Sequence, residues 1–361
     1  MLDIKLKLKP GHTSERNWMK PSPLKTLFWN ITYNCNFHCP VCFTDAGETQ
    51  PGELTTAQAF RAVQKIHEAG VHDVIISGGE PFIRGDMVDI LEEMARFGIS
   101  ARIASNGSLL TDEILSRLKR TTLTKSFQIS LDTVDPDSYE RFHNASPGTF
   151  IRVMDTLGLI QEYGFHTTVS VRVMPETLPG IPRLLDLAVS KDWSTVTLHI
   201  PVLTRRVKNV FPVGADVISL LNPVFEQFCS LPQKWLVETY IPWAEYHPLI
   251  KTLASRVRVI YRGCRAGRDR LTINPTGMLS PCVCLDVPEA YVGNVKQDSL
   301  QDVFTHSEFC DLMRHPPDYG ICEDCPNAAT CGGGCRVMAH AFSGRLDGPD
   351  LSCPVRQRIG H

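Results

Sequence analysis

The chain has 361 residues, 43% of them hydrophobic, and its 37 basic and 39 acidic residues leave a formal net charge of −2. This length predicts two or three domains with enough core to fold without disulfide staples. The near-neutral charge excludes a general attraction to nucleic acid or to an anionic membrane, and no apolar run reaches the roughly 18 residues of a spanning helix. Because the first residues also lack an apolar stretch of signal-peptide length, we expect a soluble, cytoplasmic protein without nucleic-acid or membrane partners.

Strand-like and helix-like segments alternate from residue 27 to about residue 202. The expected strands are short apolar runs at 27–32, 73–79, 101–107, 126–132, 166–174 and 195–202. The expected helices have apolar residues at helical spacing and cover 56–70, 87–98, 111–120, 149–163 and 180–191. Thr111 is placed to cap the third of these helices, and Gly70 is placed to end the first.

This alternation predicts an α/β fold with a parallel sheet and helices outside it. Six strand–helix units favour a partial (β/α)6 barrel, because a full TIM barrel takes about 250 residues. The chain is thereby divided into an N-terminal extension, the partial barrel, a bridge of helices and loops, and a Cys-rich tail, at 1–25, 26–202, 203–262 and 263–361. Such a turn-rich tail with weak periodicity is typical of segments that pack around inorganic centres.

The 13 cysteines are unevenly placed. Three fall within eight residues, none follows for 186 residues, and nine lie between Cys264 and Cys353. A secreted disulfide framework would neither cluster its cysteines at two ends nor leave an odd number. The pattern therefore predicts thiolates that bind metal in a reducing compartment.

The first cluster is Cys35, Cys39 and Cys42, in the loop that follows the first expected strand. Three thiolates at this spacing can hold three corners of a cubane cluster and leave one iron open for another ligand. A zinc site completed by His38 is the alternative. The loop position favours a functional centre, because this face of a parallel barrel carries active sites.

Polar residues also follow the next three expected strands. The motifs are SGGEP from Ser77, SNG from Ser105 and SLD from Ser130. Glycines allow a ligand to approach the backbone closely, and the Glu80 carboxylate is suited to receive an amino group. Each motif alone is compatible with an ordinary polar loop, but together they place polar groups at one end of four consecutive strands.

The order CNFHCPVC, GGEP, SNG and SLD resembles the radical S-adenosylmethionine superfamily. The resemblance implies a [4Fe–4S] cluster on the three N-terminal cysteines, with S-adenosylmethionine bound through its amino and carboxylate groups to the open iron. It places Gly78, Gly79 and Glu80 at the amino group, and Ser105, Asn106 and Ser130 near the ribose and carboxylate. The aromatic residue that usually precedes the third cysteine is replaced by Val41, with Phe43 just beyond.

The cysteines of the tail resemble the SPASM extension of the same superfamily, which holds two auxiliary iron–sulfur clusters, expected to be [4Fe–4S]. The resemblance assigns Cys322, Cys325, Cys331 and Cys353 to the distal cluster. It assigns Cys264, Cys282 and Cys335 to the proximal cluster, whose fourth ligand is either Cys284 or a position left open. Two four-thiolate zinc sites are the alternative from spacing alone. Cys229 and Cys310 are expected to be buried small apolar residues.

The resemblance implies an enzyme that cleaves S-adenosylmethionine reductively and removes a hydrogen atom from its substrate, with flavodoxin or ferredoxin as electron donor. We expect a small polar natural-product precursor of sugar or nucleoside type, leading to oxidation, elimination, decarboxylation or epimerisation. The 34 residues before Cys35 are too few for the leader-binding domain that many peptide maturases carry. Val283, where sulfatase-maturing relatives have an acidic residue, disfavours that activity.

Two other functions stay open. One is a SPASM maturase of a ribosomally made peptide with a separate leader-binding protein, and the ending LDGPDLSC resembles mycofactocin-type maturases. The other is a non-catalytic iron–sulfur electron carrier or a zinc-stabilised scaffold. Catalytic residues are not fixed by sequence, and the acid–base candidates are Asp286, Arg172 and His199, although a strand side chain that points outward is equally compatible with the last two.

Overall fold

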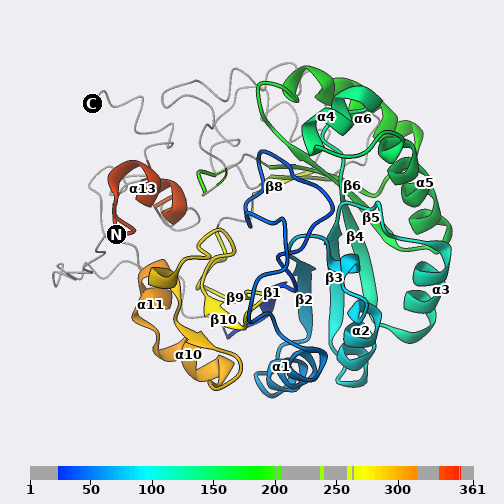
Figure 1. The fold of residues 1–361 in the computed structure, drawn as a ribbon. Helices are drawn as coiled ribbons and strands as arrows, with labels where there is room; N and C mark the ends of the chain where they lie inside the picture. The colour runs from blue at the N-terminus through cyan, green and yellow to red at the C-terminus, as the bar shows by residue number, and fades with distance from the viewer. Residues whose placement is uncertain are drawn as a thin grey trace.

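A computed structural model of the protein describes residues 23–199, 202–204, 206, 236–239, 258–261, 264–314, 333–348 and 350. Its centre is a curved sheet with helices along the outer side (Figure 1). The first six strands pair in parallel in chain order. They are β1 (Thr26–Asn30), β2 (Asp73–Ser77), β3 (Ser100–Ser105), β4 (Thr124–Ser130), β5 (His166–Arg172) and β6 (Thr195–His199). All six expected strands are confirmed.

Six helices lie between these strands in the chain, with both α4 and α5 between β4 and β5, and they form the outer layer of Figure 1. They are α1 (Thr56–Glu68), α2 (Met87–Arg96), α3 (Asp112–Thr121), α4 (Pro136–His143), α5 (Thr149–Glu162) and α6 (Ile181–Ser190). Short 3-10 turns precede α2 and α6, at Pro81–Ile83 and Leu178–Gly180. Five of the six helices were expected, and α4 was not.

The helix ends follow local chemistry. The backbone N–H of Ile114 donates to the Thr111 hydroxyl, 3.2 Å away, so Thr111 caps α3 as expected. Thr55 and Gln58 form a reciprocal capping box at the start of α1. Gly70 follows the end of α1 with a φ of 72°, a left-handed conformation that costs glycine little.

The region expected to be a bridge of helices and loops, 203–262, instead carries two strands of the same sheet. β7 (Leu236–Thr239) pairs in parallel with β6, and β8 (Arg258–Tyr261) pairs in parallel with β7. Each is only four residues long, so its own pattern was too short to predict a strand. The expectation of helices and loops alone was wrong at these positions.

The Cys-rich tail also joins the sheet. β9 (Arg270–Ile273) pairs in parallel with β1, while β10 (Met278–Ser280) and β11 (Gly293–Asn294) continue it in antiparallel. The order is β11-β10-β9-β1-β2-β3-β4-β5-β6-β7-β8, and the described strands leave the sheet open. The yellow strands β9 and β10 therefore lie beside the blue β1 in Figure 1. The partial barrel is confirmed, and the tail extends its first edge.

Three helices follow β11 in the described part of the tail, α10 (Leu300–His306), α11 (Glu308–Arg314) and α13 (Arg336–Ser343), and a 3-10 turn precedes it at Pro288–Ala290. Cys310 lies on α11 and is fully buried, which confirms its expected place in a core.

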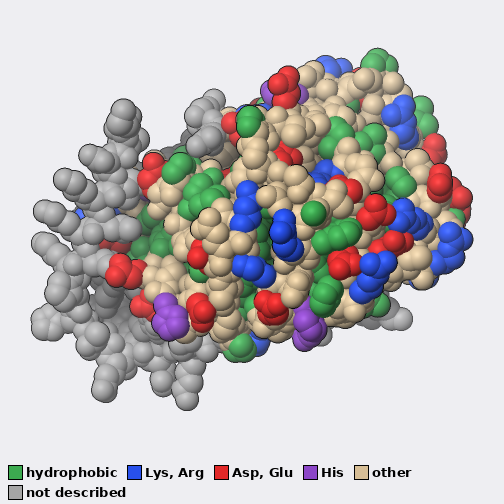
Figure 2. All heavy atoms as spheres, turned by 60° about the horizontal axis from the view of Figure 1, so that its bottom comes forward, with side chains coloured by type: hydrophobic (Ala, Val, Ile, Leu, Met, Phe, Trp, Pro, Cys, Tyr) green, Lys and Arg blue, Asp and Glu red, His purple; other side chains and the backbone are tan. Residues whose placement is uncertain are grey.

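Acidic and basic side chains are intermixed over the face drawn in Figure 2, in keeping with the near-neutral charge. Within the described ranges, none of the helices has both the length and the apolar character needed to cross a membrane. The face drawn in Figure 2 therefore gives little indication of function, and the polar residues at the carboxyl ends of the strands are more informative.

Candidate functional site

The loop that leaves β1 carries the first three cysteines, and backbone hydrogen bonds fix its entry. Cys35 N–H donates to the Gly47 carbonyl at 2.9 Å, which closes the loop on itself. The backbone N–H groups of Gly79 and Glu80 donate to the carbonyls of Thr32 and Asn34, both at 2.8 Å. The end of β2 therefore holds the segment directly before Cys35.

The two glycines of the GGE motif are required by this contact. A Cβ at Gly79 would lie 2.0 Å from the Asn34 carbonyl oxygen, and a Cβ at Gly78 would lie 2.5 Å from that of Thr32. Gly78 also has a φ of 133°, which L side chains rarely adopt. The sequence suggested close approach of a ligand, but the structure shows close approach of the cysteine loop itself.

Hydrogen-bond donors surround two of the three sulfur atoms. The backbone N–H of Phe37 lies 3.4 Å from Cys35 Sγ, and that of Ala46 lies 3.3 Å from Cys42 Sγ. The Thr44 hydroxyl lies 3.2 Å from Cys42 Sγ. Backbone N–H donors of this kind stabilise thiolates and tune the clusters that they hold, so these contacts fit an iron–sulfur cluster.

Burial raises the pKa of Cys35 to about 11 and that of Cys39 to about 12. At neutral pH the Cys35 and Cys39 thiols therefore keep their protons until a bound metal centre displaces those protons. Among the described residues, no three Cys, His, Asp or Glu side chains are placed to hold one metal ion, so the zinc site with His38 gains no support. A cubane holds its ligands farther apart than a single ion does, and this finding does not bear on it.

Cys39 begins a chain of buried polar contacts that the sequence did not indicate. Its Sγ lies 3.2 Å from Nδ1 of His143, the last residue of α4, and the other ring nitrogen lies 3.2 Å from Asp132 Oδ2. Asp132 accepts from the Arg172 backbone N–H at 2.5 Å and from its guanidinium. The Arg172 guanidinium also donates to the Ser130 hydroxyl at 3.1 Å.

These contacts determine which side chains of this polar network are charged. Burial alone would raise the pKa of Asp132, but the Arg172 cation and the His143 ring hold it below its ordinary value. Burial lowers the pKa of His143, although Asp132 opposes the shift. Asp132 is thus an anion that Arg172 neutralises. No spacing rule would have found His143, because it reaches Cys39 only through tertiary packing.

Glu80 is fully buried and its carboxylate is occupied by the protein. Oε1 accepts from the Ser105 hydroxyl at 2.9 Å and from the Phe82 N–H at 3.2 Å, and Oε2 accepts from the Asn106 N–H at 2.8 Å. Burial raises its pKa to about 7 despite these donors. The Glu80 carboxylate, which we expected to be open to a ligand, is therefore hydrogen-bonded to Ser105 and Asn106 at the end of β3. The sequence did not indicate that Glu80 joins these two strand ends.

Asn106 connects the third strand to the cysteine loop. Its Nδ2 donates to Asn36 Oδ1 at 2.9 Å, and Asn36 Nδ2 donates to the Ser108 hydroxyl at 2.9 Å. Asn36 lies between Cys35 and Cys39, so its position in the sequence could have identified it as a candidate site residue. The structure thus brings the GGE, SNG and cysteine motifs into one polar network, with SLD joined through Arg172.

Four of the five described cysteines of the tail, Cys264, Cys282, Cys284 and Cys335, pack against one buried cluster. Burial and the Cys282 sulfur raise the pKa of Cys264, and burial together with Asp350, Cys264 and Cys282 raises that of Cys335. Cys284 interacts with Cys282, and this hydrogen bond is the main reason that the pKa of Cys282 rises. The distal ligands Cys322, Cys325, Cys331 and Cys353 lie outside the described residues, as does Cys229.

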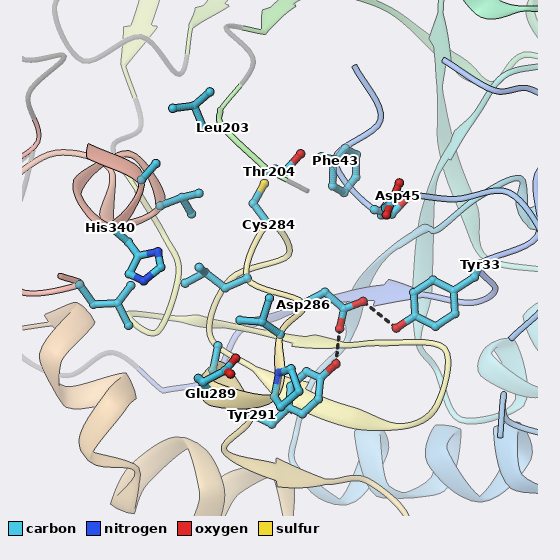
Figure 3. Close-up of a pocket in the computed structure, with 18 of the residues that line it drawn as sticks. Tyr33, Phe43, Asp45, Leu203, Thr204, Cys284, Asp286, Glu289, Tyr291 and His340 are labelled. Carbon is cyan, nitrogen blue, oxygen red and sulfur yellow. Dashed lines mark hydrogen bonds between the residues drawn. The ribbon is translucent and has the colours of Figure 1, made fainter. Parts of the chain in front are cut away.

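A cavity of about 610 Å³ lies between the cysteine loop and the tail (Figure 3). Its wall includes Tyr33 and Phe43 from the loop, Cys284 and Asp286 from the tail, and His340 from α13. Figure 3 shows the Cys284 side chain pointing toward Thr204 at the cavity, whereas the four other described tail cysteines are not part of the wall.

Of the three acid–base candidates, only Asp286 lines the cavity. Arg172 and His199 face each other in register at the ends of β5 and β6, and Arg172 is engaged by Asp132. Phe43 also lines the cavity, in a T-shaped contact with Phe28. Val41, at the position before the third cysteine that is usually aromatic, is instead buried in a small hydrophobic cluster with Met174.

An open parallel barrel with a three-cysteine loop after its first strand, and a cysteine-bearing tail beside it, defines an iron–sulfur enzyme of the S-adenosylmethionine-cleaving type. Family models agree, since the Radical SAM superfamily matches residues 29–188 and the SPASM iron–sulfur cluster-binding domain matches residues 264–326. The chain belongs to the radical SAM superfamily and has a C-terminal SPASM domain. Its cofactors are a [4Fe–4S] cluster with S-adenosylmethionine and auxiliary iron–sulfur clusters.

Curated relatives match along most of the chain. Mycofactocin maturase MftC of Mycobacterium tuberculosis (strain ATCC 25618 / H37Rv) is 29% identical over 333 residues, covering 91% of this chain and 82% of that protein. AdoMet-dependent heme synthase of Nitratidesulfovibrio vulgaris is 26% identical over 352 residues, covering 92% and 93%. PqqA peptide cyclase of Rhizobium meliloti is 23% identical over 364 residues, covering 97% and 93%.

A solved structure shares the fold. Streptococcus suis SuiB bound to S-adenosylmethionine superposes with a TM-score of 0.71 at 19% identity, covering 91% of this chain and 76% of that one. At this identity the likeness concerns the fold alone.

Proposed function

We propose that this radical SAM enzyme is a maturase that modifies a ribosomally made peptide and acts with a separate leader-binding protein. The observation that carries the proposal is the match to a mycofactocin maturase, 29% identical over 91% of the chain. The match to a PqqA peptide cyclase supports it. These relatives shift the balance away from the sugar- or nucleoside-type substrate that the sequence analysis favoured.

Cys35, Cys39 and Cys42 are the proposed ligands of the catalytic cluster, and their donor set supports this assignment. When bound, the cluster and S-adenosylmethionine supply a 5′-deoxyadenosyl radical that removes a hydrogen atom from the substrate. The protein's own part is to hold the substrate at the cysteine loop and to exclude water and stray hydrogen donors. Flavodoxin or ferredoxin is the proposed electron donor.

The S-adenosylmethionine contacts are proposed at the carboxyl ends of β2 to β4. Gly78 and Gly79 offer backbone groups for the amino group, while Glu80 orients Ser105 and Asn106 rather than meeting the ligand through its occupied carboxylate. Ser130 stays the proposed contact of the ribose or carboxylate. These roles follow the family resemblance, adjusted to where the side chains lie.

In the tail, Cys264, Cys282 and Cys335 are the proposed proximal ligands, and their packing against one buried hydrophobic cluster supports this assignment. Cys284 stays a candidate fourth ligand through its contact with Cys282, although it also borders the cavity. The distal ligands are proposed to be Cys322, Cys325, Cys331 and Cys353.

A tetrapyrrole substrate is the second candidate, because an AdoMet-dependent heme synthase is 26% identical over 92% of the chain. The cavity argues against it. Asp286 and Glu289 line the cavity, whereas porphyrin substrates carry carboxylates that these side chains would repel. The peptide therefore fits the cavity better.

The proposal is tested with protein reconstituted anaerobically. Three cubanes predict about twelve irons per chain. With reductant and S-adenosylmethionine, the protein should release 5′-deoxyadenosine, and a Cys42→Ala variant should not. The peptide encoded beside this chain's gene, added with the adjacent leader-binding protein, should change in mass, and a heme precursor should not. If the heme precursor were converted and the peptide were not, the tetrapyrrole would replace the peptide as the proposed substrate.

A further inference from the structure

Three hydrogen-bond donors converge on one carboxylate in the wall of the cavity. Tyr33 donates its hydroxyl to Asp286 Oδ2 at 2.6 Å, while Tyr291 Oη and Asn274 Nδ2 donate to Oδ1 at 2.9 and 2.8 Å. Figure 3 shows Asp286 between the two tyrosine rings. A carboxylate has about four lone-pair sites, so two donors fill Oδ1 and Oδ2 keeps one acceptor site.

The framework around Asp286 holds it in one orientation. Asn274 follows β9 and is 2% exposed, and its Nδ2 also lies 3.1 Å from the Tyr33 hydroxyl and 3.2 Å from the Tyr291 hydroxyl, so its two hydrogens are shared among three acceptors. The side-chain oxygen of Asn274, Oδ1, in turn accepts hydrogen bonds from the backbone N–H groups of Thr276 and Met278. Because every donor is itself anchored, Asp286 presents its remaining acceptor site in a fixed direction.

The charges of the cavity favour one class of ligand. Asp45, Asp286 and Glu289 line it, His340 is its one histidine, and no Lys or Arg appears among the described wall residues. Arg206 lies nearby and forms an ion pair with Asp45, 2.9 Å away, so these two charges offset each other and the acidic character of the wall comes from Asp286 and Glu289. The remaining wall is largely aromatic and aliphatic, which suits an apolar side chain with a few oriented polar contacts.

The cavity also borders the catalytic loop. Thr44 lines it and places its hydroxyl 3.2 Å from Cys42 Sγ, and Tyr33 lies two residues before Cys35. A ligand group held by Asp286 therefore lies in a cavity whose wall includes Tyr33 and Thr44, each two residues from a proposed cluster ligand.

We infer that Asp286 is the specificity-determining residue of this cavity. It accepts a hydrogen bond from a substrate amide N–H, hydroxyl or amine, and it disfavours a carboxylate at the same position. The inference rests on the proposed function and deepens it, because a peptide offers an N–H donor at almost every residue. An anionic group meets the negative carboxylate instead, with no basic wall residue to compensate.

Two probes of matched shape test this selectivity. Tyramine and 3-(4-hydroxyphenyl)propionate share a phenol ring and a two-carbon arm, but end in an amine and a carboxylate. Binding to the reconstituted full chain with S-adenosylmethionine is measured by isothermal titration calorimetry. Tyramine should bind about tenfold or more tightly than the acid, a difference of about 1.4 kcal/mol.

Asp286→Asn should bring the two affinities within about threefold of each other, because the amide removes the charge and adds a donor of its own. Glu289→Gln is the matched control, since it also removes one negative charge from the wall but lies outside the Asp286 network; the preference should persist. Tyr33→Phe frees a second acceptor site on Oδ2 and should keep the preference too.

The inference is overturned by equal binding of the probes to the unsubstituted protein, by no measurable binding of either, or by a preference that survives Asp286→Asn. A loss of preference in Glu289→Gln as large as in Asp286→Asn would also overturn it, since general charge would then explain selection. Release of 5′-deoxyadenosine without substrate is measured on the same samples. Its absence would count against the proposed function and leave the binding ratio interpretable.

Discussion

The Cys39 sulfur lies 3.2 Å from Nδ1 of His143, although 104 residues separate them in sequence. The other ring nitrogen, Nε2, lies 3.2 Å from Oδ2 of Asp132, which is neutralised by Arg172 at the end of β5. A proposed cluster ligand is thus connected to the neighbouring strand ends by a buried polar chain. A neutral imidazole carries one N–H, and the ring donates to the Cys39 sulfur when that proton is on Nδ1. Such a donor tunes the reduction potential, because it withdraws charge from the sulfur.

Two substitutions at His143 separate its contacts. Asn places an amide near the Nδ1 position and Gln places one near Nε2, so His143→Asn can still donate to Cys39 while His143→Gln cannot. We expect His143→Gln to lower the reduction potential of the first cluster and alter its EPR signal, and His143→Asn to stay close to the unsubstituted protein. An EPR-monitored redox titration measures both.

His67→Gln, at an exposed position on α1, is the control for the general effect of losing an imidazole. Indistinguishable potentials and EPR signals in His143→Gln and the control would mean that the Cys39–His143 contact has no influence on the cluster.

Glu80 makes the stability of the cluster-free protein depend on pH. Burial raises its pKa from 4.5 to about 7 in the folded state. A carboxyl with a raised pKa contributes its stabilisation fully below pH 4.5 and loses it as the pH rises through about 7. Relative to Glu80→Gln, the free energy of unfolding should fall by on the order of 3 kcal/mol across this range and then level off.

Urea denaturation at several pH values measures the difference, and Glu68→Gln at the exposed end of α1 serves as the control. Parallel pH profiles for the unsubstituted protein and Glu80→Gln would mean that the three donors to Glu80, rather than its burial, set its ionisation.

Gly79 tests the contact between the GGE motif and the cysteine loop. A methyl group at Gly79 would lie 2.0 Å from the Asn34 carbonyl oxygen, a backbone atom that cannot move aside without displacing Cys35. Gly79→Ala should therefore cost about 1–3 kcal/mol of stability and reduce iron at the first cluster. Gly85→Ala is the matched control, because its Cβ would meet nothing within 4 Å.

Melting temperature and iron content report the two effects separately. A Gly79→Ala protein that loads iron normally would show that the loop can shift without losing its ligand geometry.

The sequence was sufficient for the parallel core because β1 to β6 carry apolar runs and their helices carry regular stripes. It was insufficient for α4, an eight-residue helix that buries only Tyr139 and His143 and so has almost no periodic signal. It also could not place β7 and β8, whose four-residue runs are stabilised by pairing at the sheet edge.

The same limit applies to the candidate site. Motif order located the cysteine loop and the strand ends, since these depend on chain topology. The direction of the Glu80 carboxylate and the partnership of Tyr33 with Asp286 depend on tertiary contacts, the latter across 253 residues. Neither contact has a local pattern, so only the folded arrangement reveals it.

The described cysteines of the tail provide the last test, because burial alone does not distinguish a ligand from a core residue. Cys264 and Cys310 are both shielded, but only Cys264 has another tail thiol beside it, that of Cys282. Cys264→Ala should lose about four irons per chain. Cys310→Ala should keep all of its iron and lose about 1 kcal/mol of stability, as a small truncation in a core does. Iron and sulfide analysis with urea denaturation measures both variants, and equal iron loss in the two would withdraw the assignment of Cys264 as a ligand.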